Sequence, residues 1–307
     1  MGQIEFNSVN HSIPEVKKDI WKRINCFFYP FLIIRPFNCL FSFICTYFGA
    51  VYSGASPLNS LSYLLALSAS LIAGAGYVIN DICDIEIDKI NQPHRILPSG
   101  KMSLLQARYL TLLMGFSGII ISLFSPNYWH LIIASANLFL LFMYAVSFKK
   151  RGLSGNLIVA WSAASTFLYG ALSSTKPIKV LPIMVFAFLY TIIREWTKTI
   201  EDYEGDKSQN AKTLAVVLGK DKVAKWIIIP IALIFSSIFI FYFTKLTNAF
   251  VFIMLNVLVF IPLVFFLIVL NRSQHPQIVR KIHHWMKLDM FVLLLIFFTS
   301  YLFSGIY

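Results

Sequence analysis

The sequence comprises 307 residues, of which 58% are hydrophobic and only 13% are charged. Because a soluble globular domain carries about one quarter charged residues, this composition excludes an ordinary water-soluble fold and favours a membrane protein. The formal net charge of +12 does not indicate nucleic-acid binding, since no polar domain presents a basic stripe. The excess of Lys and Arg is instead typical of the cytoplasmic loops that orient membrane helices.

The first 26 residues are polar and charged, and they precede the first long apolar segment. We therefore expect no cleavable signal peptide, and residues 14–26 predict an interfacial helix whose cationic side chains reach the lipid headgroups. After this N-terminal cytoplasmic or interfacial segment, residues 1–26, we expect residues 27–307 to form a single transmembrane domain. The four cysteines lack metal-ligand spacing, so neither a metal-binding cysteine pair nor a disulfide framework is predicted.

Apolar segments long enough to cross a bilayer, which requires about 20 residues, recur along the whole chain. A short break of Ser, Pro and Asn at 125–127 separates the third from the fourth. The sequence predicts an all-α membrane protein with about nine transmembrane helices. The expected spans are 28–51, 58–79, 106–125, 129–147, 155–174, 178–197, 224–243, 247–270 and 287–306.

The distribution of Lys and Arg between the loops sets the orientation of these spans. If the N-terminus is cytoplasmic, nearly all of the 26 Lys and Arg residues fall in the N-terminal segment or in cytoplasmic loops. The exceptions are Lys176, Lys179 and Lys245 on the opposite face, and Arg35 within the first span. Because cytoplasmic loops are enriched in Lys and Arg, we expect a cytoplasmic N-terminus and a C-terminus on the opposite face of the cell membrane.

Acidic residues are rare, and nine of the 14 Asp and Glu residues fall in two short stretches. Each stretch lies at the cytoplasmic end of a predicted span. In the first stretch, Asn80, Asp81, Asp84 and Asp88 share one face if the second span continues as a helix. Carboxylates in or near hydrocarbon are costly and by default mark a functional site.

The second acidic stretch repeats the i, i+4 spacing at Asp202 and Asp206. Carboxylates stacked on one helix face repel each other, so a cation is expected to hold them. Mg²⁺ fits because it takes hard oxygen ligands, retains several waters and bridges one or two carboxylates to substrate phosphates. Solvated helix ends are the plainer interpretation, but two such sets on one membrane face favour a site facing the cytoplasm. The predicted metal ligands, whose aspartates are also the predicted catalytic residues, are Asn80, Asp81, Asp84, Asp88, Asp202 and Asp206.

Basic residues alternate with both acidic stretches. A diphosphate bound through metal ions needs such cationic partners, with Arg suited to forked contacts and Lys acting as a point charge. Arg95 and Lys198 are close in sequence to the acidic stretches, and we expect both to bind diphosphate. For any single lysine, a role in orienting the protein is the alternative.

Residues 80–100, NDICDIEIDKINQPHRILPSG, resemble the first signature of the UbiA superfamily of membrane prenyltransferases, N-D-x-x-D-x-x-x-D followed by N-x-P-x-R-x-x-x-S-G. Residues 198–219, KTIEDYEGDKSQNAKTLAVVLG, resemble the second signature. Residues 144–156 are similar to the segment that enters the fifth helix of these enzymes. Residues 35–38, Arg-Pro-Phe-Asn, match the R-P-x-N of the first helix. The resemblance covers essentially the whole chain in order, including the nine-helix count.

This resemblance implies a Mg²⁺-dependent enzyme that moves a prenyl group from its diphosphate to a lipophilic acceptor by way of an allylic carbocation. The metal-bound aspartates would neutralise the departing diphosphate, and Lys149 would assist Arg95 and Lys198. Tyr144, by its family position, would face the carbocation, although an interfacial aromatic anchor is the alternative. Polar residues within a span should face a cavity, so Arg35 and Asn38 are expected to bind substrate.

Within the superfamily, both signatures are most similar to enzymes of the digeranylgeranylglyceryl phosphate synthase type, which transfer a geranylgeranyl group to an ether-linked prenylglyceryl phosphate. Chlorophyll synthases share much of both signatures, so a chlorin and a quinone precursor stay open as acceptors. Thr199 departs from the family pattern, because relatives often carry Asp at this position. A hydroxyl group cannot replace an anionic ligand, so the second acidic set is expected to be one ligand poorer.

A cation transporter with acidic ion-binding motifs is the alternative from another functional class. Transporter sites lie near the membrane midplane between inverted repeats, whereas both acidic stretches here are predicted at one face. This placement favours a substrate with a cytoplasmic head group and a tail in the lipid. A non-catalytic lipid-binding scaffold would leave the two acidic stretches unexplained. His283, His284 and Trp285 are interpreted as interface residues rather than ligands.

Overall fold

The computed structural model describes residues 28–149, 151–208 and 210–304, and the interfacial helix expected over residues 14–26 lies outside these ranges. Within them, every regular element is helical apart from one isolated bridge between Arg151 and Lys212. The elements are α2 (Pro36–Tyr52), α3 (Ser60–Cys83), α4 (Ile85–Asn91), α5 (Leu104–Ser122), α6 (Trp129–Met143), η1 (Tyr144–Phe148), α7 (Gly152–Ala171), η2 (Pro177–Val180), α8 (Leu181–Glu201), α9 (Tyr203–Ser208), α10 (Leu214–Leu218), α11 (Lys220–Trp226), α12 (Ile228–Phe243), α13 (Ala249–Leu255), η3 (Asn256–Phe260), α14 (Ile261–Arg272) and α15 (Pro276–Ser304).

Seven helical segments in the described part of the chain are long and apolar enough to cross a membrane, which confirms the expected all-α membrane protein. Of the other expected spans, α2 has 17 residues, and α7 has 20 residues that include several Gly and Ser. The qualifying segments are Ser60–Cys83, Leu104–Ser122, Trp129–Phe148, Pro177–Glu201, Lys220–Phe243, Ala249–Arg272 and Pro276–Phe303.

Element boundaries differ from the expected spans where charged residues extend a helix beyond its apolar part. The last helix begins at Pro276, whereas the expected span began at residue 287. The earlier start was not predicted, because the first turns carry Arg, Lys and His and so do not belong to the apolar run. The second expected span ends at residue 79, whereas α3 continues to Cys83 and is followed by α4 from Ile85, so helix extends through most of the first acidic stretch. Asp84 stands between them.

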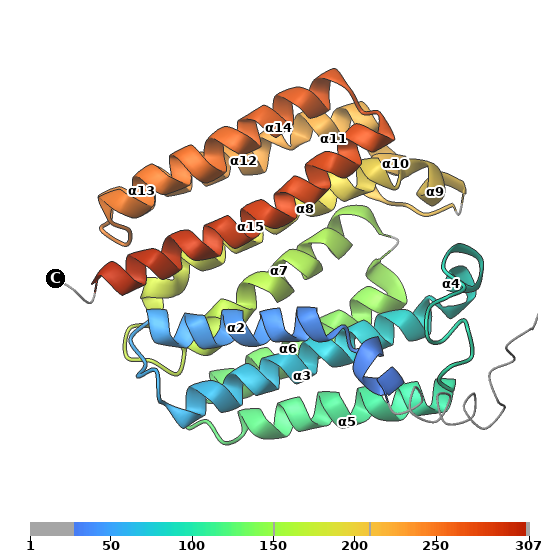
Figure 1. The fold of residues 1–307 in the computed structure, drawn as a ribbon, viewed down its shortest axis with the longest axis horizontal. Coiled ribbons are helices and arrows are strands. Elements are labelled where there is room, and N and C mark those ends of the chain that lie inside the picture. The colour runs from blue at the N-terminus through green and yellow to red at the C-terminus, as the bar shows by residue number, and fades with distance from the viewer. Residues whose placement is uncertain (1–27, 150, 209, 305–307) are drawn as a thin grey trace, which may run out of the picture.

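The long helices form a bundle in which the N-terminal and C-terminal parts lie on opposite sides (Figure 1). Helices α2, α3, α5 and α6 make up one side, α8 and α11 to α15 make up the other, and α7 lies between them. The short helices α4 and α9 project at the same end of the bundle. The bridge between Arg151 and Lys212 connects the turn before α7 to the loop after α9 at this end.

Two glycines allow α2 and α7 to cross in close contact. A Cβ at Gly170 would lie 1.7 Å from the carbonyl oxygen of Thr46, and a Cβ at Gly49 would lie 2.3 Å from that of Phe167. Neither clash can be relieved by a side-chain rotation, because both involve backbone atoms. Small residues at such crossings allow membrane helices to pack without a hydrophobic driving force.

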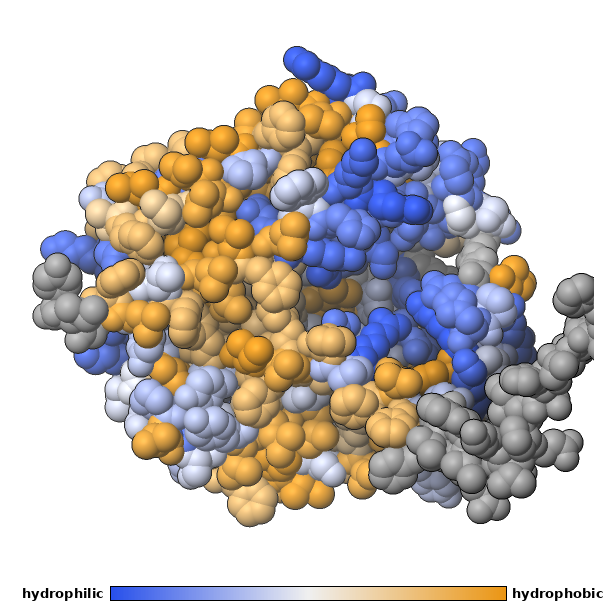
Figure 2. All heavy atoms as spheres, in the orientation of Figure 1, coloured by the Kyte–Doolittle hydropathy of each residue, from blue (hydrophilic) through white to orange (hydrophobic). Residues whose placement is uncertain are grey.

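The largest cluster of buried apolar side chains belongs to the C-terminal side, where α8 packs against α7, α12 and α15. Large apolar side chains also cover the outside of the bundle, and Phe37, Leu58 and Ile90 are each more than four-fifths exposed. Figure 2 shows this hydrophobic surface over much of one face of the molecule, with hydrophilic side chains gathered around a hollow at the end that carries α4 and α9. A contiguous apolar surface of this kind suits contact with lipid.

Candidate active site

The first acidic set lies where α3 ends and α4 begins. Asn80 and Asp81 occupy the last turn of α3, Asp84 joins the two helices, and Asp88 lies in the first turn of α4. The amide of Asp84 donates to the carbonyl of Asn80 at 3.0 Å, and that of Asp88 donates to the carbonyl of Asp84 at 2.8 Å. These helical hydrogen bonds across the junction keep the i, i+4 spacing despite the interruption. Asp84 and Asp88 are only 6% and 5% exposed.

Each carboxylate of the first set has a cationic partner. Nη2 of Arg35 donates to Oδ1 of Asp81 at 2.7 Å. Nη1 of Arg95 donates to Oδ2 of Asp88 at 2.6 Å and also lies 3.8 Å from Asp81. Lys149 forms an ion pair with Asp84. Buried carboxylates require such partners, because an unpaired charge away from water is costly.

The second acidic set caps α8. Asp202 follows the last residue of α8, and the amide of Asp206 in α9 donates to the Asp202 carbonyl at 2.9 Å. Within the described residues neither carboxylate forms an ion pair within 4 Å. Burial raises the pKa of both carboxyl groups above the ordinary aspartate value, although the nearby charge of Lys198 acts in the opposite direction.

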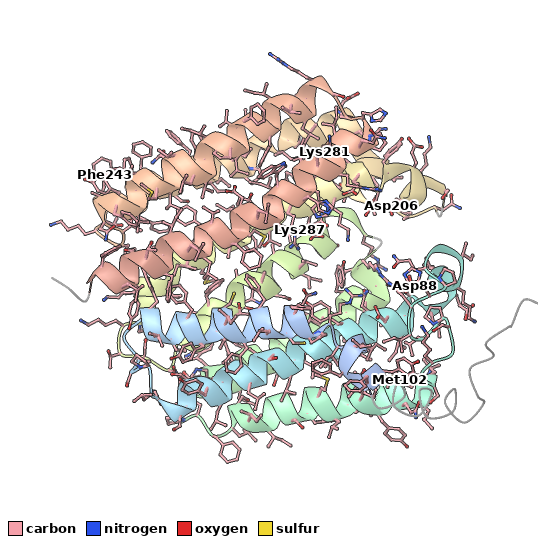
Figure 3. The ribbon with its side chains drawn as sticks, in the orientation of Figure 1. Asp88, Met102, Asp206, Phe243, Lys281 and Lys287 are labelled. Carbon is pink, nitrogen blue, oxygen red and sulfur yellow. The ribbon has the colours of Figure 1, made fainter. Side chains whose placement is uncertain are left out.

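Lys149 connects the two acidic sets. Its ammonium group forms an ion pair with Asp84 and is close enough to Asp206 for an electrostatic interaction. Figure 3 shows Asp88 and Asp206 at the same end of the bundle, on elements from its two sides. The structure therefore brings together the two sets that are separated by more than a hundred residues in the sequence.

Arg35 and Asn38 lie at the start of α2, beside the first acidic set. Arg35 has a left-handed backbone with φ of 56°, a conformation that costs a non-glycine residue about 1–3 kcal/mol. Its guanidinium pairs with Asp81 and lies 5.1 Å from the centre of the Tyr77 ring. Asn38 is within hydrogen-bonding reach of Tyr77. The strained backbone thus directs a cation toward the carboxylates.

Tyr144 begins the π-helical turn η1, directly after α6. Its side chain is near enough to Asp84 and Arg35 on one side, and to Arg194 and Glu195 on the other, to interact electrostatically with all four. Single π-helical turns inside α-helices are frequent at functional sites. Tyr144 therefore lies among charged side chains from both sides of the bundle.

Other charged residues at this end of the bundle were not predicted as site residues. Arg194, two turns before Asp202 on α8, donates from Nη2 to Oε1 of Glu195 at 2.8 Å. Glu201 lies 2.8 Å from Nδ1 of His283 and accepts from Nε of Arg280 at 3.2 Å, which connects α8 to α15. The interpretation of His283 as an interface residue missed this contact. The i, i+4 spacing from Arg194 through Lys198 to Asp202 could have placed Arg194 on the same helix face as the second acidic set.

The oxygen donors of the two acidic sets suit Mg²⁺. No group of three or more His, Cys, Asp or Glu side chains converges on one point among the residues that the structure describes. Mg²⁺ requires no such cage, since it is commonly bound by one or two carboxylates together with waters and substrate phosphates. The amide oxygen of Asn80 is buried without a hydrogen-bond partner in the described chain, and such a neutral oxygen is a suitable ligand. The residues present therefore fit Mg²⁺ bound jointly with a phosphorylated substrate.

This arrangement can bind a polyanion at the end of an apolar bundle. Arg35, Arg95, Lys149 and Lys198 are the cations that surround the carboxylates. When the carboxylates bind metal ions, these cations become available to pair with a diphosphate instead. An apolar tail attached to such a head group would extend along helices whose surfaces are suited to lipid.

The profile of the UbiA prenyltransferase family matches residues 42–299 of the chain. The chain is 39% identical over 237 residues to digeranylgeranylglyceryl phosphate synthase of Saccharolobus solfataricus, an alignment that covers 75% of this chain and 82% of that protein. It is 34% identical over 266 residues to the enzyme of the same name from Methanosphaera stadtmanae, with 85% and 94% of the two chains covered.

Solved structures agree with these sequence matches. A structure described as digeranylgeranylglyceryl phosphate synthase in membranes superimposes with a TM-score of 0.78 at 28% identity, covering 90% of this chain and 99% of that one. A UbiA homologue from Archaeoglobus fulgidus, bound to DMAPP and Mg²⁺, has the same fold, with a TM-score of 0.63 at 17% identity and 86% and 97% coverage. With its fold and both sequence signatures, this chain belongs to the UbiA prenyltransferase family.

Proposed function

We propose that the protein transfers a geranylgeranyl group from geranylgeranyl diphosphate to the free hydroxyl of a prenylglyceryl phosphate. The observation that carries this proposal is the pair of acidic sets at one end of a membrane bundle, connected through Lys149. The names of its relatives support this acceptor over a chlorin or a quinone precursor. In the reaction the allylic carbon–oxygen bond to diphosphate breaks and an ether bond to the acceptor oxygen forms. The hydroxyl proton and the diphosphate are released.

Mg²⁺ is the cofactor of this proposal. When bound, it supplies Lewis-acid neutralisation of the leaving diphosphate, which is worth several kcal/mol. The side chains that would hold it present hard oxygen atoms on both sides of the hollow, and the free amide oxygen of Asn80 is available without breaking an existing hydrogen bond. The proposed ligands are Asn80, Asp81, Asp84, Asp88, Asp202 and Asp206.

Arg95, Lys149 and Lys198 bind the diphosphate in this proposal. Arg95 and Lys149 form ion pairs with carboxylates of the first set. When those carboxylates bind metal ions instead, both cations are positioned to contact phosphate oxygens. The charge of Lys198 stabilises the ionised forms of Asp202 and Asp206, and Lys198 forms no ion pair within 4 Å among the described residues. Charge-assisted hydrogen bonds to a phosphate are among the stronger protein contacts.

Tyr144, Arg35 and Asn38 bind the reacting part of the substrates. The Tyr144 ring lies among side chains of both sides of the bundle, where an aromatic face stabilises a developing allylic cation. Arg35 and Asn38 are anchored to Tyr77 and Asp81, which orients them toward the same space. The apolar walls exclude water, which would otherwise capture the cation.

The proposed topology has nine crossings in a single transmembrane domain that follows residues 1–26, with α2 and α7 added to the seven apolar segments. The N-terminus lies in the cytoplasm and the C-terminus on the opposite face. The distribution of Lys and Arg supports this orientation, since α4 and α9 are at the basic end of the molecule. The active site accordingly opens to the cytoplasm, where a diphosphate head group is soluble.

The direct test is an assay of purified protein in detergent with labelled geranylgeranyl diphosphate, Mg²⁺ and a panel of acceptors. We expect labelled ether product with prenylglyceryl phosphate, none with aromatic or chlorin acceptors, and none after addition of EDTA. Product on an aromatic or chlorin acceptor alone would contradict the proposed acceptor. Because detergent solution has no ion gradient, a cation transporter would form no product with any acceptor.

A further inference from the structure

Arg194 is a cation within the bundle whose hydrogen-bonding capacity is mostly unused. A guanidinium has five N–H donors. The Nη2 atom donates to Glu195 at 2.8 Å, and the one hydrogen bond of Nη1 within the described ranges is to the sulfur of Met290 at 3.9 Å. The Nε atom is buried and has no partner among the described residues. An unsatisfied buried donor of a charged group is costly, so the unused donors of this side chain are suited to binding an anion.

The position of Arg194 is central. Its charge acts on Tyr77 of α3, on Tyr144 of η1 and on His283 of α15, so the guanidinium lies between the two sides of the bundle. On α8 it precedes Lys198 and Asp202 by one and two turns, with a pitch of about 5.4 Å per turn. Arg194 is therefore deeper in the bundle than the second acidic set, on the same face of α8.

A second cation, Lys287, approaches the same place from α15. It lies one turn after His283, on which both Lys287 and Arg194 act, and three residues before Met290, the residue that Arg194 contacts. No carboxylate lies within 4 Å of Lys287 in the described parts of the chain. Figure 3 shows Lys287 in the half of α15 nearer to Asp206. The nearby carboxylates have other partners, since Glu195 pairs with Arg194 itself and Glu201 pairs with Arg280 and His283.

We propose that Arg194 and Lys287 bind the phosphate of the glycerol acceptor and so select a phosphorylated acceptor over an uncharged one. The inference rests on the proposed function, in which the diphosphate of the donor occupies the level of Asp202 and Lys198. The allylic carbon then lies below that level, and the acceptor hydroxyl must reach it. In a short glycerol backbone the phosphate is close to the hydroxyl, which places it beside Arg194 and Lys287.

The test compares Arg194→Gln and Lys287→Gln with the matched control Lys281→Gln, a change at an exposed lysine of the same helix. Steady-state kinetics are measured with prenylglyceryl phosphate and with the same prenylglycerol without phosphate. A charge-assisted contact to phosphate is worth about tenfold or more in affinity. We expect each site variant to raise KM for the phosphorylated acceptor about tenfold or more and to leave KM for geranylgeranyl diphosphate within about threefold. The preference for the phosphorylated acceptor should fall in the site variants and stay unchanged in Lys281→Gln.

Equilibrium binding of the two acceptors, measured without the prenyl diphosphate, keeps this inference separate from the proposed function. Weaker binding of the phosphorylated acceptor alone in the site variants supports the phosphate site even if the wild-type protein forms no ether product. An unchanged preference in the variants overturns the inference even if the protein forms the ether product. A rise in KM for the prenyl diphosphate instead of the acceptor also overturns it, because the cations would then belong to the donor site. If Arg194→Gln does not fold, Lys287→Gln and Arg194→Lys carry the same measurements.

Discussion

The two acidic sets have the same i, i+4 spacing but different electrostatic surroundings. In the set on α3 and α4, each of the three aspartates has an Arg or Lys partner, through Arg35, Arg95 and Lys149. In the set on α8 and α9, Asp202 and Asp206 have no ion pair within 4 Å among the described residues. The carboxylates of the first set thus have cationic partners within the chain, whereas those of the second set carry charge that a metal ion would neutralise.

The largest effect is expected when either acidic set loses one of its proposed metal ligands. Asp81→Ala and Asp202→Ala should each lower prenyl transfer by about 100-fold or more, because each removes a proposed ligand of a metal that contributes several kcal/mol. The measurement is kcat/KM of protein shown to be folded by size-exclusion chromatography. Glu86→Gln and Glu204→Gln are the controls, since both glutamates are exposed, and both should retain near-normal activity. Near-normal transfer by Asp202→Ala would contradict a catalytic role for the second set.

The sets should differ in thermal stability when metal is absent. Asp88→Asn leaves Arg95 without its 2.6 Å partner and should lower the free energy of unfolding by about 1–2 kcal/mol, a value reduced for partial exposure. Asp202→Asn removes an uncompensated charge and should leave Tm unchanged or raise it. The midpoints are measured in detergent with EDTA. A decrease in Tm for Asp202→Asn as large as that for Asp88→Asn would contradict the electrostatic difference.

Lys149 tests whether the sets are coupled. Lys149→Met leaves Asp84, a buried carboxylate, without its cation, and also removes a charge that acts on Asp206. We expect a lower Tm and about tenfold less transfer, because both sets lose a cation they share. Lys89→Met is the matched control, since Lys89 pairs with Glu86 on the surface, where such pairs contribute little. Equal effects of the two substitutions would indicate that Lys149 is only an orienting charge.

The smallest effect is expected at Thr199, which donates from its hydroxyl to the carbonyl of Trp196 at 2.8 Å. Thr199→Asp would add the carboxylate that relatives often carry, close to a set whose charge is already uncompensated. We expect Mg²⁺ to bind about two- to fivefold more tightly, and Tm in EDTA to fall slightly through like-charge repulsion. Thr199→Asn, which has nearly the same shape without the charge, should show neither change. The measurement is the Mg²⁺ dependence of Tm.

Much of this architecture could be predicted from the sequence, because apolar runs and the alternation of Lys and Arg reflect the energetics of the bilayer directly. The acidic positions, spaced by one helical turn, were also readable. The interruption at Asp84 could not be predicted, since a single residue between two helices changes neither the apolar content nor the spacing of the acidic residues. The start of α15 was also missed, because its cationic first turns lie beyond the apolar run.

The partners of the site residues could not be predicted from the sequence. Arg35 and Asp81, or Lys149 and Asp84, are far apart in the chain and meet only through the packing of separate helices. Arg194 was counted among the loop cations, because its electrostatic interaction with Tyr77 of α3 and its contact with Met290 of α15 depend on how α8 is rotated in the bundle. Spacing along one helix is local information, whereas the choice of partner is tertiary.

The most direct test of the central claim measures diphosphate release and ether formation in the same detergent sample. Purified protein is supplied with labelled geranylgeranyl diphosphate, prenylglyceryl phosphate and Mg²⁺. If the two acidic sets act together, the wild-type protein releases diphosphate and forms labelled ether in equal amounts. Asp81→Ala, Asp202→Ala and samples with EDTA should give neither product. Intact geranylgeranyl diphosphate after incubation with folded wild-type protein and Mg²⁺ would contradict the claim that this site ionises an allylic diphosphate.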